Sequence, residues 1–259
     1  MARRRLAAVF AHPDDDTWML GGSYLLAGDD LELTVVVATS GEAGLIADAS
    51  LATRETLGEV REREELAALE AGGRAGADVH FLRYPDGGVA GVDREELVGR
   101  IAEILAAAQP EVVVTFGPDG GTGHEDHIAV SEATTEAFHR LRGAAGERGG
   151  FRALYYGSLA QSELERWFEE MRARGEEVDP DAPFMPRAVP DETIAVRVDT
   201  SGVAERKLEA LLRHETQSEE IGALAEGEPD LLGAESFVRA WPKVEHPSGP
   251  FASSLFDGL

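Results

Sequence analysis

The sequence predicts an α/β fold: a Rossmann-like, mostly parallel sheet with helices on both faces and a functional site at the carboxyl ends of the strands. Two runs, 31–38 and 111–116, are rich in β-branched and apolar residues and carry them on both faces, as strands in the middle of a parallel sheet do. Segments with helical spacing alternate with such runs through the first half of the chain, which is typical of strand–helix–strand units.

The first half of the chain supplies most of this pattern. Short apolar runs predict the strands 6–11, 31–38, 79–82 and 111–116. Helical spacing predicts helices over 18–27 and 54–72, a helix capped by Asp93 that runs to Ala108, and another that begins near His127. A glycine-rich loop at 117–123 separates the last strand from the last helix.

The second half is less regular. We expect a surface loop at 142–150, a strand at 153–157, a helix at 162–174, a proline-rich connector or lid at 180–190, a strand at 192–198 and a helix at 203–215. From Gly227 onward glycine and proline recur, so we expect mostly loop. Neither the loop nor the connector is long enough to separate domains, so we expect a single domain over residues 1–259.

Composition narrows the function. The 24 basic and 49 acidic side chains give a net charge of −25, which argues against a nucleic acid or an anionic membrane as partner. The basic start of the chain is followed by an apolar run only from Leu6 to Ala11, too short for a secretory signal, so we expect a cytoplasmic protein. Cysteine is absent, so any metal must be held by histidine and carboxylate ligands.

The residues that carry chemistry follow two predicted strands. His12, Asp14, Asp15 and Asp16 come after the first, and His124, Asp126 and His127 come after the strand at 111–116. Carboxyl ends of parallel strands share one edge of the sheet, so both segments should meet there. Two imidazoles and one carboxylate can ligate zinc and leave its fourth position open for water. A second carboxylate can act as general base, and a further histidine can stabilise an oxyanion. The structural alternative is a cluster of turn and helix-capping residues.

The same residues resemble a known family. Ala11-His12-Pro13-Asp14-Asp15 after the first strand, together with Gly123-His124-Glu125-Asp126-His127 after a later one, is similar to the PIG-L/LmbE-type zinc-dependent N-deacetylases. Three further segments are similar to this family: the helix around Arg61, Glu64 and Ala68, the turn at 81–87, and the late helix from Lys207 to Gln217. The resemblance covers a core of about residues 1–217 and leaves 218–259 as a variable C-terminal segment.

The resemblance implies a role for each matching residue. His12, Asp15 and His127 would be the metal ligands, for Zn²⁺ or Fe²⁺. Asp14 would be the general base, and His124 would stabilise the oxyanion with its ring oriented by Asp126. Arg61 and Asp86 would contact sugar hydroxyls. The implied reaction is hydrolysis of an N-acyl, above all N-acetyl, group on a small amino sugar or glycoconjugate; a homo-oligomer is compatible with this.

Other functions remain open from the sequence. The fold could serve as a non-catalytic sugar- or nucleotide-binding module, but such a module would be expected to have lost at least one of the ligand, base or oxyanion residues. An amidase acting on a thiol conjugate fits the same residues. A Mg²⁺-dependent phosphatase fits less well, because Mg²⁺ prefers oxygen ligands to imidazole.

Overall fold

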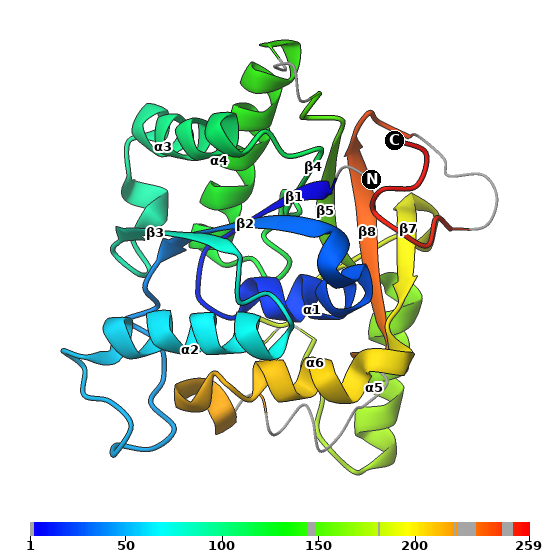
Figure 1. Ribbon diagram of the computed structural model, residues 1–259. Coiled ribbons are helices and arrows are strands. Elements are labelled where there is room, and N and C mark those ends of the chain that lie inside the picture. Colours follow the sequence, from blue (N-terminus) through cyan, green and yellow to red (C-terminus); the bar gives the residue numbers. More distant parts are fainter. Residues whose placement is uncertain (1–2, 145–148, 181, 220, 222–231, 245–250) are drawn as a thin grey trace.

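The computed structural model describes residues 3–144, 149–180, 182–219, 221, 232–244 and 251–259 (Figure 1). Its centre is an eight-stranded sheet in the order β3-β2-β1-β4-β5-β8-β7, with the short β6 paired to β5. The strands are β1 (Arg4–Phe10), β2 (Leu31–Thr39), β3 (Asp78–Tyr84), β4 (Val112–Phe116), β5 (Ala153–Ala160), β6 (Ala188–Val189), β7 (Ile194–Asp199) and β8 (Ala234–Trp241).

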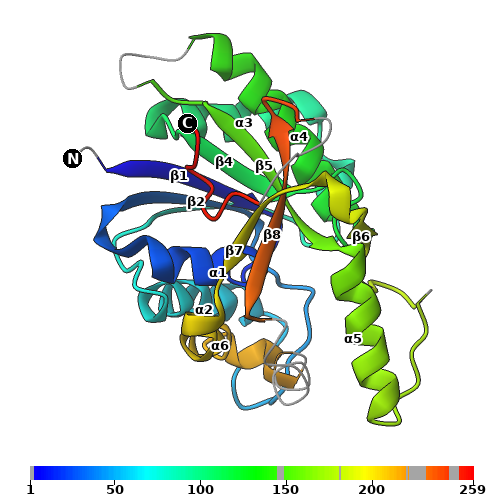
Figure 2. The same cartoon turned by 90° about the vertical axis from the view of Figure 1, so that its right-hand side faces the viewer.

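Helices cover both faces of this sheet, as predicted. The helices α3 (Arg94–Ala108) and α4 (Glu125–Leu141) lie on one face, and α1 (Asp15–Ala27), α2 (Leu57–Ala71) and α6 (Ala204–Leu211) lie on the other (Figures 1 and 2). The helix α5 (Gln161–Ala173) projects beyond the edge of the sheet (Figure 2). No helix in the described part of the chain is long and apolar enough to cross a membrane.

The order of the strands creates a switch point. β1 pairs in parallel with β2 on one side and with β4 on the other, so the chain winds away from β1 in two directions. Loops that leave such neighbouring strands diverge and open a crevice at the carboxyl edge of the sheet. Residues 11–14 leave β1 at this crevice and residues 117–124 leave β4 there, which places the two segments singled out by the sequence side by side.

The C-terminal region differs from the expectation. Residues 234–241 form β8, which runs antiparallel to both β5 and β7 within the same sheet, so the expectation of loop was wrong there. The strand contains Phe237, which is fully buried. Its apolar pattern is short and is flanked by glycine and proline, so the sequence did not indicate a strand. The expected loop residues 227–231 and 245–250, and 145–148 of the earlier loop, lie outside the described residues.

A buried ion pair fixes the middle of α1. Lys207 Nζ lies 2.7 Å from Glu235 Oε1 and donates to the carbonyl of Trp18 at 2.7 Å, while the amide of Gly22 donates to the same carboxylate at 2.7 Å. Trp18 and Gly22 are one helical turn apart, so the pair ties α6 and β8 to a single turn of α1. Glycine is required at 22, since a Cβ there would lie 2.4 Å from the Thr200 side chain.

A second set of buried polar contacts joins α2 to the segment after α6. Glu64 accepts hydrogen bonds from the backbone amide of Thr216 at 2.8 Å and from its hydroxyl at 2.6 Å. His214 is fully buried, and its Nε2 lies 3.9 Å from Glu65 Oε2. Burial, reinforced by the positive charge of Arg61, lowers the pKa of His214 to about 3, so the folded protein keeps this ring neutral.

Replacing Lys207 with methionine should strongly destabilise the protein, because it leaves the Glu235 carboxylate buried without its cation; both side chains are 2% exposed. Loss of one partner of such a pair costs about 3–5 kcal/mol in the free energy of unfolding, measured with urea. Lys207→Met/Glu235→Gln should recover part of the loss. Arg213→Ala, which removes an exposed pair with Glu209, should cost less than about 0.5 kcal/mol. Equal losses for Lys207→Met and Arg213→Ala would contradict this account.

The protein should lose stability in acid because His214 stays neutral in the folded state. The pKa of a histidine in the unfolded chain is about 6.5, so between that pH and about 3 the unfolded state binds the extra proton and the protein loses stability as pH falls. The loss from this residue is on the order of 3 kcal/mol between pH 8 and pH 4. Urea unfolding of His214→Gln should therefore show a shallower fall than the wild type over this range, and parallel curves would argue against the assignment.

Candidate metal centre and active site

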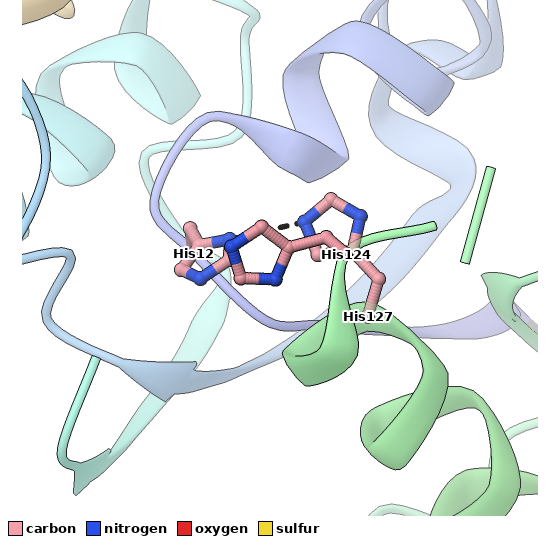
Figure 3. A group of neighbouring side chains, drawn as sticks. All are labelled: His12, His124 and His127. Atoms are coloured by element: carbon pink, nitrogen blue, oxygen red, sulfur yellow. Dashed lines mark hydrogen bonds between the residues drawn. The ribbon is translucent and has the colours of Figure 1, made fainter. Parts of the chain in front are cut away.

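Three imidazoles meet at the switch point. His12 comes from the turn after β1, while His124 and His127 come from the start of α4, which follows β4 (Figure 3). The backbone amide of His12 donates to Asp15 Oδ2 at 2.7 Å, which fixes the turn that leads into α1. His127 stacks on Phe116 with ring centroids 4.0 Å apart. The structure therefore brings together the residues that the sequence placed after two separate strands.

The predicted ligand atoms have the spacing of a metal site. His12 Nδ1 and His127 Nε2 are 3.1 Å apart, and Asp15 places Oδ2 3.6 Å from the first and Oδ1 3.6 Å from the second. Two ligand atoms of a tetrahedral zinc ion are about 3.4 Å apart, so these residues could hold one ion between them. In the described residues, two other groups bring one ligand atom of each member within 4.8 Å of the others: His12 with His124 and His127, and His12 with Asp86 and Asp126.

Each of the two imidazoles has an oxygen atom close to its other nitrogen. His127 Nδ1 lies 2.9 Å from the carbonyl of Gly120, and His12 Nε2 lies 3.1 Å from Asp86 Oδ1 and 3.5 Å from Asp126 Oδ2. A ring nitrogen that donates its proton outward leaves a lone pair on the other nitrogen, and metal-binding histidines are oriented in this way. Asp86 and Asp126 thus act on His12, and the prediction that Asp86 contacts a sugar stays a prediction.

The charges around His12 also favour a cation. Burial opposes protonation of this ring, but the carboxylates of Asp126, Asp15 and Asp86 outweigh it and raise the pKa of His12 well above its usual value. Burial alone would raise the pKa of Asp15, yet His127 and His12 hold it well below its usual range. Burial lowers the pKa of His127. Acidic groups crowded around two imidazoles fit Zn²⁺ or Fe²⁺, which take nitrogen and oxygen ligands together.

Asp14 faces away from Asp15 because its backbone is unusual. Its φ is 104°, a region that residues with a side chain rarely adopt. Glu65 accepts the Asp14 amide at 3.1 Å, and Arg61 donates to the Pro13 carbonyl at 2.7 Å and to Asp14 Oδ2 at 2.9 Å. These contacts hold the turn, so Asp15 can face a metal while its neighbour Asp14 faces the substrate.

The environment of Asp14 suits a base. Burial raises the pKa of this carboxyl to about 7, although the Arg61 guanidinium opposes the rise. A general base works best when its pKa lies near the operating pH. Arg61 occupies only Oδ2, which leaves Oδ1 for a proton. Arg61 itself is 4% exposed and also donates to the carbonyl of Gly41 at 3.0 Å, so its predicted contact with a sugar stays a prediction.

His124 is oriented differently from the expectation. The Asp126 carboxylate is held by the amides of Gly87 at 2.7 Å and Val89 at 2.9 Å and faces His12. The prediction that this carboxylate orients the ring of His124 was therefore wrong. Instead the backbone amide of Asp126 donates to His124 Nδ1 at 3.1 Å, as part of the N-terminal cap of α4. In the neutral ring this leaves the proton on Nε2, where it can be donated.

Sequence reasoning did not identify Glu65 as part of the site. It is fully buried and lies one turn beyond Arg61 on the same face of α2. A signal was present: the buried face of α2 consists of Leu57, Arg61, Glu64, Glu65, Ala68 and Leu69, so three charged residues stand where a helix normally carries apolar ones. Charged residues in such positions need buried partners, which this site provides.

Comparison with known proteins agrees with this geometry. The family model described as "PIG-L: GlcNAc-PI de-N-acetylase" matches residues 7–138. A protein of Kineococcus radiotolerans named 1D-myo-inositol 2-acetamido-2-deoxy-alpha-D-glucopyranoside deacetylase is 34% identical over 253 residues, which cover 83% of this chain and 69% of that protein. The deacetylase class predicted from the sequence motifs is confirmed by the family match and by this relative.

Solved structures show the same fold at lower identity. The N,N'-diacetylchitobiose deacetylase of Pyrococcus horikoshii is similar over 91% of this chain and 83% of its own, with a TM-score of 0.61 and 19% identity. The 4-carboxy-2-hydroxymuconate hydratase of Pseudomonas putida KT2440 covers 93% and 98% with a TM-score of 0.64 and 21% identity, so the fold alone does not specify the reaction. The family match and the curated relative decide the assignment: the chain belongs to the PIG-L family of de-N-acetylases.

Proposed function

We propose that this chain is a metal-dependent hydrolase that removes an N-acyl group, in the first place acetyl, from an amino sugar. The observation that carries the proposal is the arrangement of His12, Asp15 and His127 around one point, with Asp14 turned to the other side. The relative from Kineococcus is named for a 2-acetamido-glucosyl inositol, so an N-acetylglucosaminyl polyol is the first substrate to test.

Each residue has a distinct task in this proposal. His12, Asp15 and His127 would hold Zn²⁺ or Fe²⁺, which when bound supplies an acidified water and polarises the amide carbonyl. Asp14 would accept the proton of the attacking water and pass it to the departing amine, and Arg61 would hold the carboxylate in place. His124 would donate its Nε2 proton to the carbonyl oxygen as negative charge develops there. Asp86 and Asp126 would keep the ring of His12 in the ligating orientation.

Metal content and amine release test the proposal together. Elemental analysis of the full chain should give about one zinc or iron per chain, and the loaded protein should release free amine from N-acetylglucosaminyl-inositol. A chelator should abolish the release, and added Zn²⁺ or Fe²⁺ should restore it. A folded protein that takes up neither ion and releases no amine would refute the proposal and favour the non-catalytic binding module.

Substitutions of the proposed base and of the proposed metal ligands should have different effects. Asp14→Asn should keep the metal and lose most turnover, because the amide cannot accept the proton. Asp15→Ala and His127→Ala should lose the metal itself. Metal content by elemental analysis and kcat for each variant make the comparison, with the exposed Asp48→Asn as the matched control. Full activity in Asp14→Asn would disprove its role as base.

The oxyanion role of His124 gives a further test. His124→Ala should retain the metal but lower kcat by about 10²–10³-fold, the usual cost of losing an oxyanion donor. His139→Ala on the same helix removes an exposed histidine and should leave kcat unchanged. If His124→Ala instead loses the metal, His124 is a ligand, and the metal is held by His12, His124 and His127 rather than by His12, Asp15 and His127.

A further inference from the structure

A pocket of about 360 Å³ opens beside the metal centre. Asp15 and His127 line one end of it, so the pocket begins at the atoms that would hold the ion. Its walls are mainly apolar and come from α1, β4, β5, α5 and the segment before β6: Trp18, Met19, Phe116, Leu159, Trp167 and Pro186. The proposed function assigns no role to this pocket. The role inferred for the pocket below rests on the proposed function.

The pocket is larger than an acetyl group needs. Pockets of about 300–1,000 Å³ bury ligands of drug size, and this one falls in that range. An acetyl group places only a methyl beyond the reacting carbonyl, which takes up about as much space as a single water of ~30 Å³. Most of the pocket would stay unfilled during deacetylation of an acetamido sugar.

The order of the strands indicates which part of the substrate enters the pocket. The metal-binding candidates come from β1 and β4 at the centre of the sheet, Arg61 and Asp86 lie on the side of β2 and β3, and the pocket lies on the side of β5 and β8. An amide carbon bears the amine on one side and the acyl chain on the other. With the sugar on the side of β2 and β3, the acyl chain points to the other side of the metal-binding candidates, into the pocket.

The charged side chains of the pocket are of two kinds. Glu163 pairs with Arg197 at 2.8 Å, and Lys207 pairs with Glu235 at 2.7 Å. Arg166 and Arg187 also line the pocket, are exposed, and have no hydrogen bond or ion pair from their guanidinium groups to any residue in the described ranges. These two arginines therefore present positive charge to the pocket that no carboxylate in the described ranges pairs with.

Arg187 is also held in position. Its backbone amide donates to the carbonyl of Gly121 at 2.7 Å, and its guanidinium lies against Gly123, where a Cβ would come within 2.3 Å of it. Gly123 has a φ of 82° and directly precedes His124. The backbone of Arg187 is therefore held at the mouth of the loop that leads into α4, and its guanidinium lies beside Gly123.

We propose that the pocket binds an N-acyl chain longer than acetyl that carries an anionic group beyond the reacting carbonyl, recognised by Arg166 and Arg187. The apolar walls would bury the methylene chain, and a guanidinium binds a carboxylate or phosphate with paired, charge-assisted hydrogen bonds. Hydrolysis breaks the amide C–N bond, adds the hydroxyl of water to the acyl carbon and gives the remaining proton to the amine. The products are a free amino sugar and a dicarboxylic or similarly charged acid.

The test compares acyl groups of one length that differ only in charge. N-adipoyl-glucosamine and its terminal-amide analogue, N-(5-carbamoylpentanoyl)-glucosamine, are offered to the metal-loaded full chain beside N-acetylglucosamine and N-acetylglucosaminyl-inositol. We expect kcat/KM for the adipoyl compound to exceed that for its amide by about tenfold or more. Arg166→Ala/Arg187→Ala should bring the ratio near one. Arg172→Ala, which removes an exposed arginine of α5 that does not line the pocket, should preserve it.

Binding without turnover gives a second readout. Trp18 and Trp167 line the pocket, so the monoamide of adipic acid, which stands for the acyl fragment, should quench tryptophan fluorescence. Quenching should weaken at least tenfold in affinity in Arg166→Ala/Arg187→Ala and stay unchanged in Arg172→Ala. Because this measurement needs no reaction, it reports on the pocket even if the proposed function fails.

The outcomes separate the two proposals. Release of amine from an acetylated substrate but not from the adipoyl compound, with no quenching, overturns the pocket assignment and leaves the proposed function standing. Equal hydrolysis of the adipoyl compound and its amide, unchanged in the arginine variants, overturns the recognition of an anionic end. No amine from any substrate, with quenching that depends on both arginines, refutes the proposed hydrolysis and supports the binding of the anionic chain.

Discussion

The backbone of Asp14 lies in a conformation that few residues with a side chain adopt, and the arrangement of the site depends on it. With φ at 104°, two adjacent carboxylates leave the chain in different directions, one toward His127 and one toward Arg61. Such a conformation costs of order 1–3 kcal/mol and persists only where the surroundings fix it. Glu65 and Arg61, one turn apart on α2, supply that fixation through the Asp14 amide and the Pro13 carbonyl.

Helix α1 connects the candidate metal site with the C-terminal half of the chain. Its first turn carries Asp15, and its next turn is tied to α6 and β8 through Lys207 and Glu235. The same turn contributes Trp18 and Met19 to the pocket. A buried ion pair adds little net stability compared with well-packed apolar residues, but it admits only one register between the elements it joins. In this protein that register relates Asp15, a candidate metal ligand, to the wall of the pocket.

Part of the acidic character of the chain is concentrated at the switch point. There Asp14, Asp15, Asp86 and Asp126 gather near two imidazoles. Repulsion within this group would destabilise it, and backbone amides, Arg61 and the imidazoles offset the repulsion. A bound cation would offset it further. The pocket next to it has the opposite feature, two arginines without a described partner, so the two halves of the crevice suit different parts of one substrate.

The sequence by itself determined the fold class, the order of the elements through α4 and the residues that meet at the candidate metal centre. These follow from local signals: buried β-branched runs, helical spacing, and histidines and aspartates directly after strands whose carboxyl ends must share an edge. Only the tertiary structure decided which group each side chain meets. Asp126 turned to His12 because distant amides of Gly87 and Val89 hold it, and β8 joined the sheet through partners far away in the chain. Lys207 and Glu235 matter through contacts between elements, which no local pattern encodes.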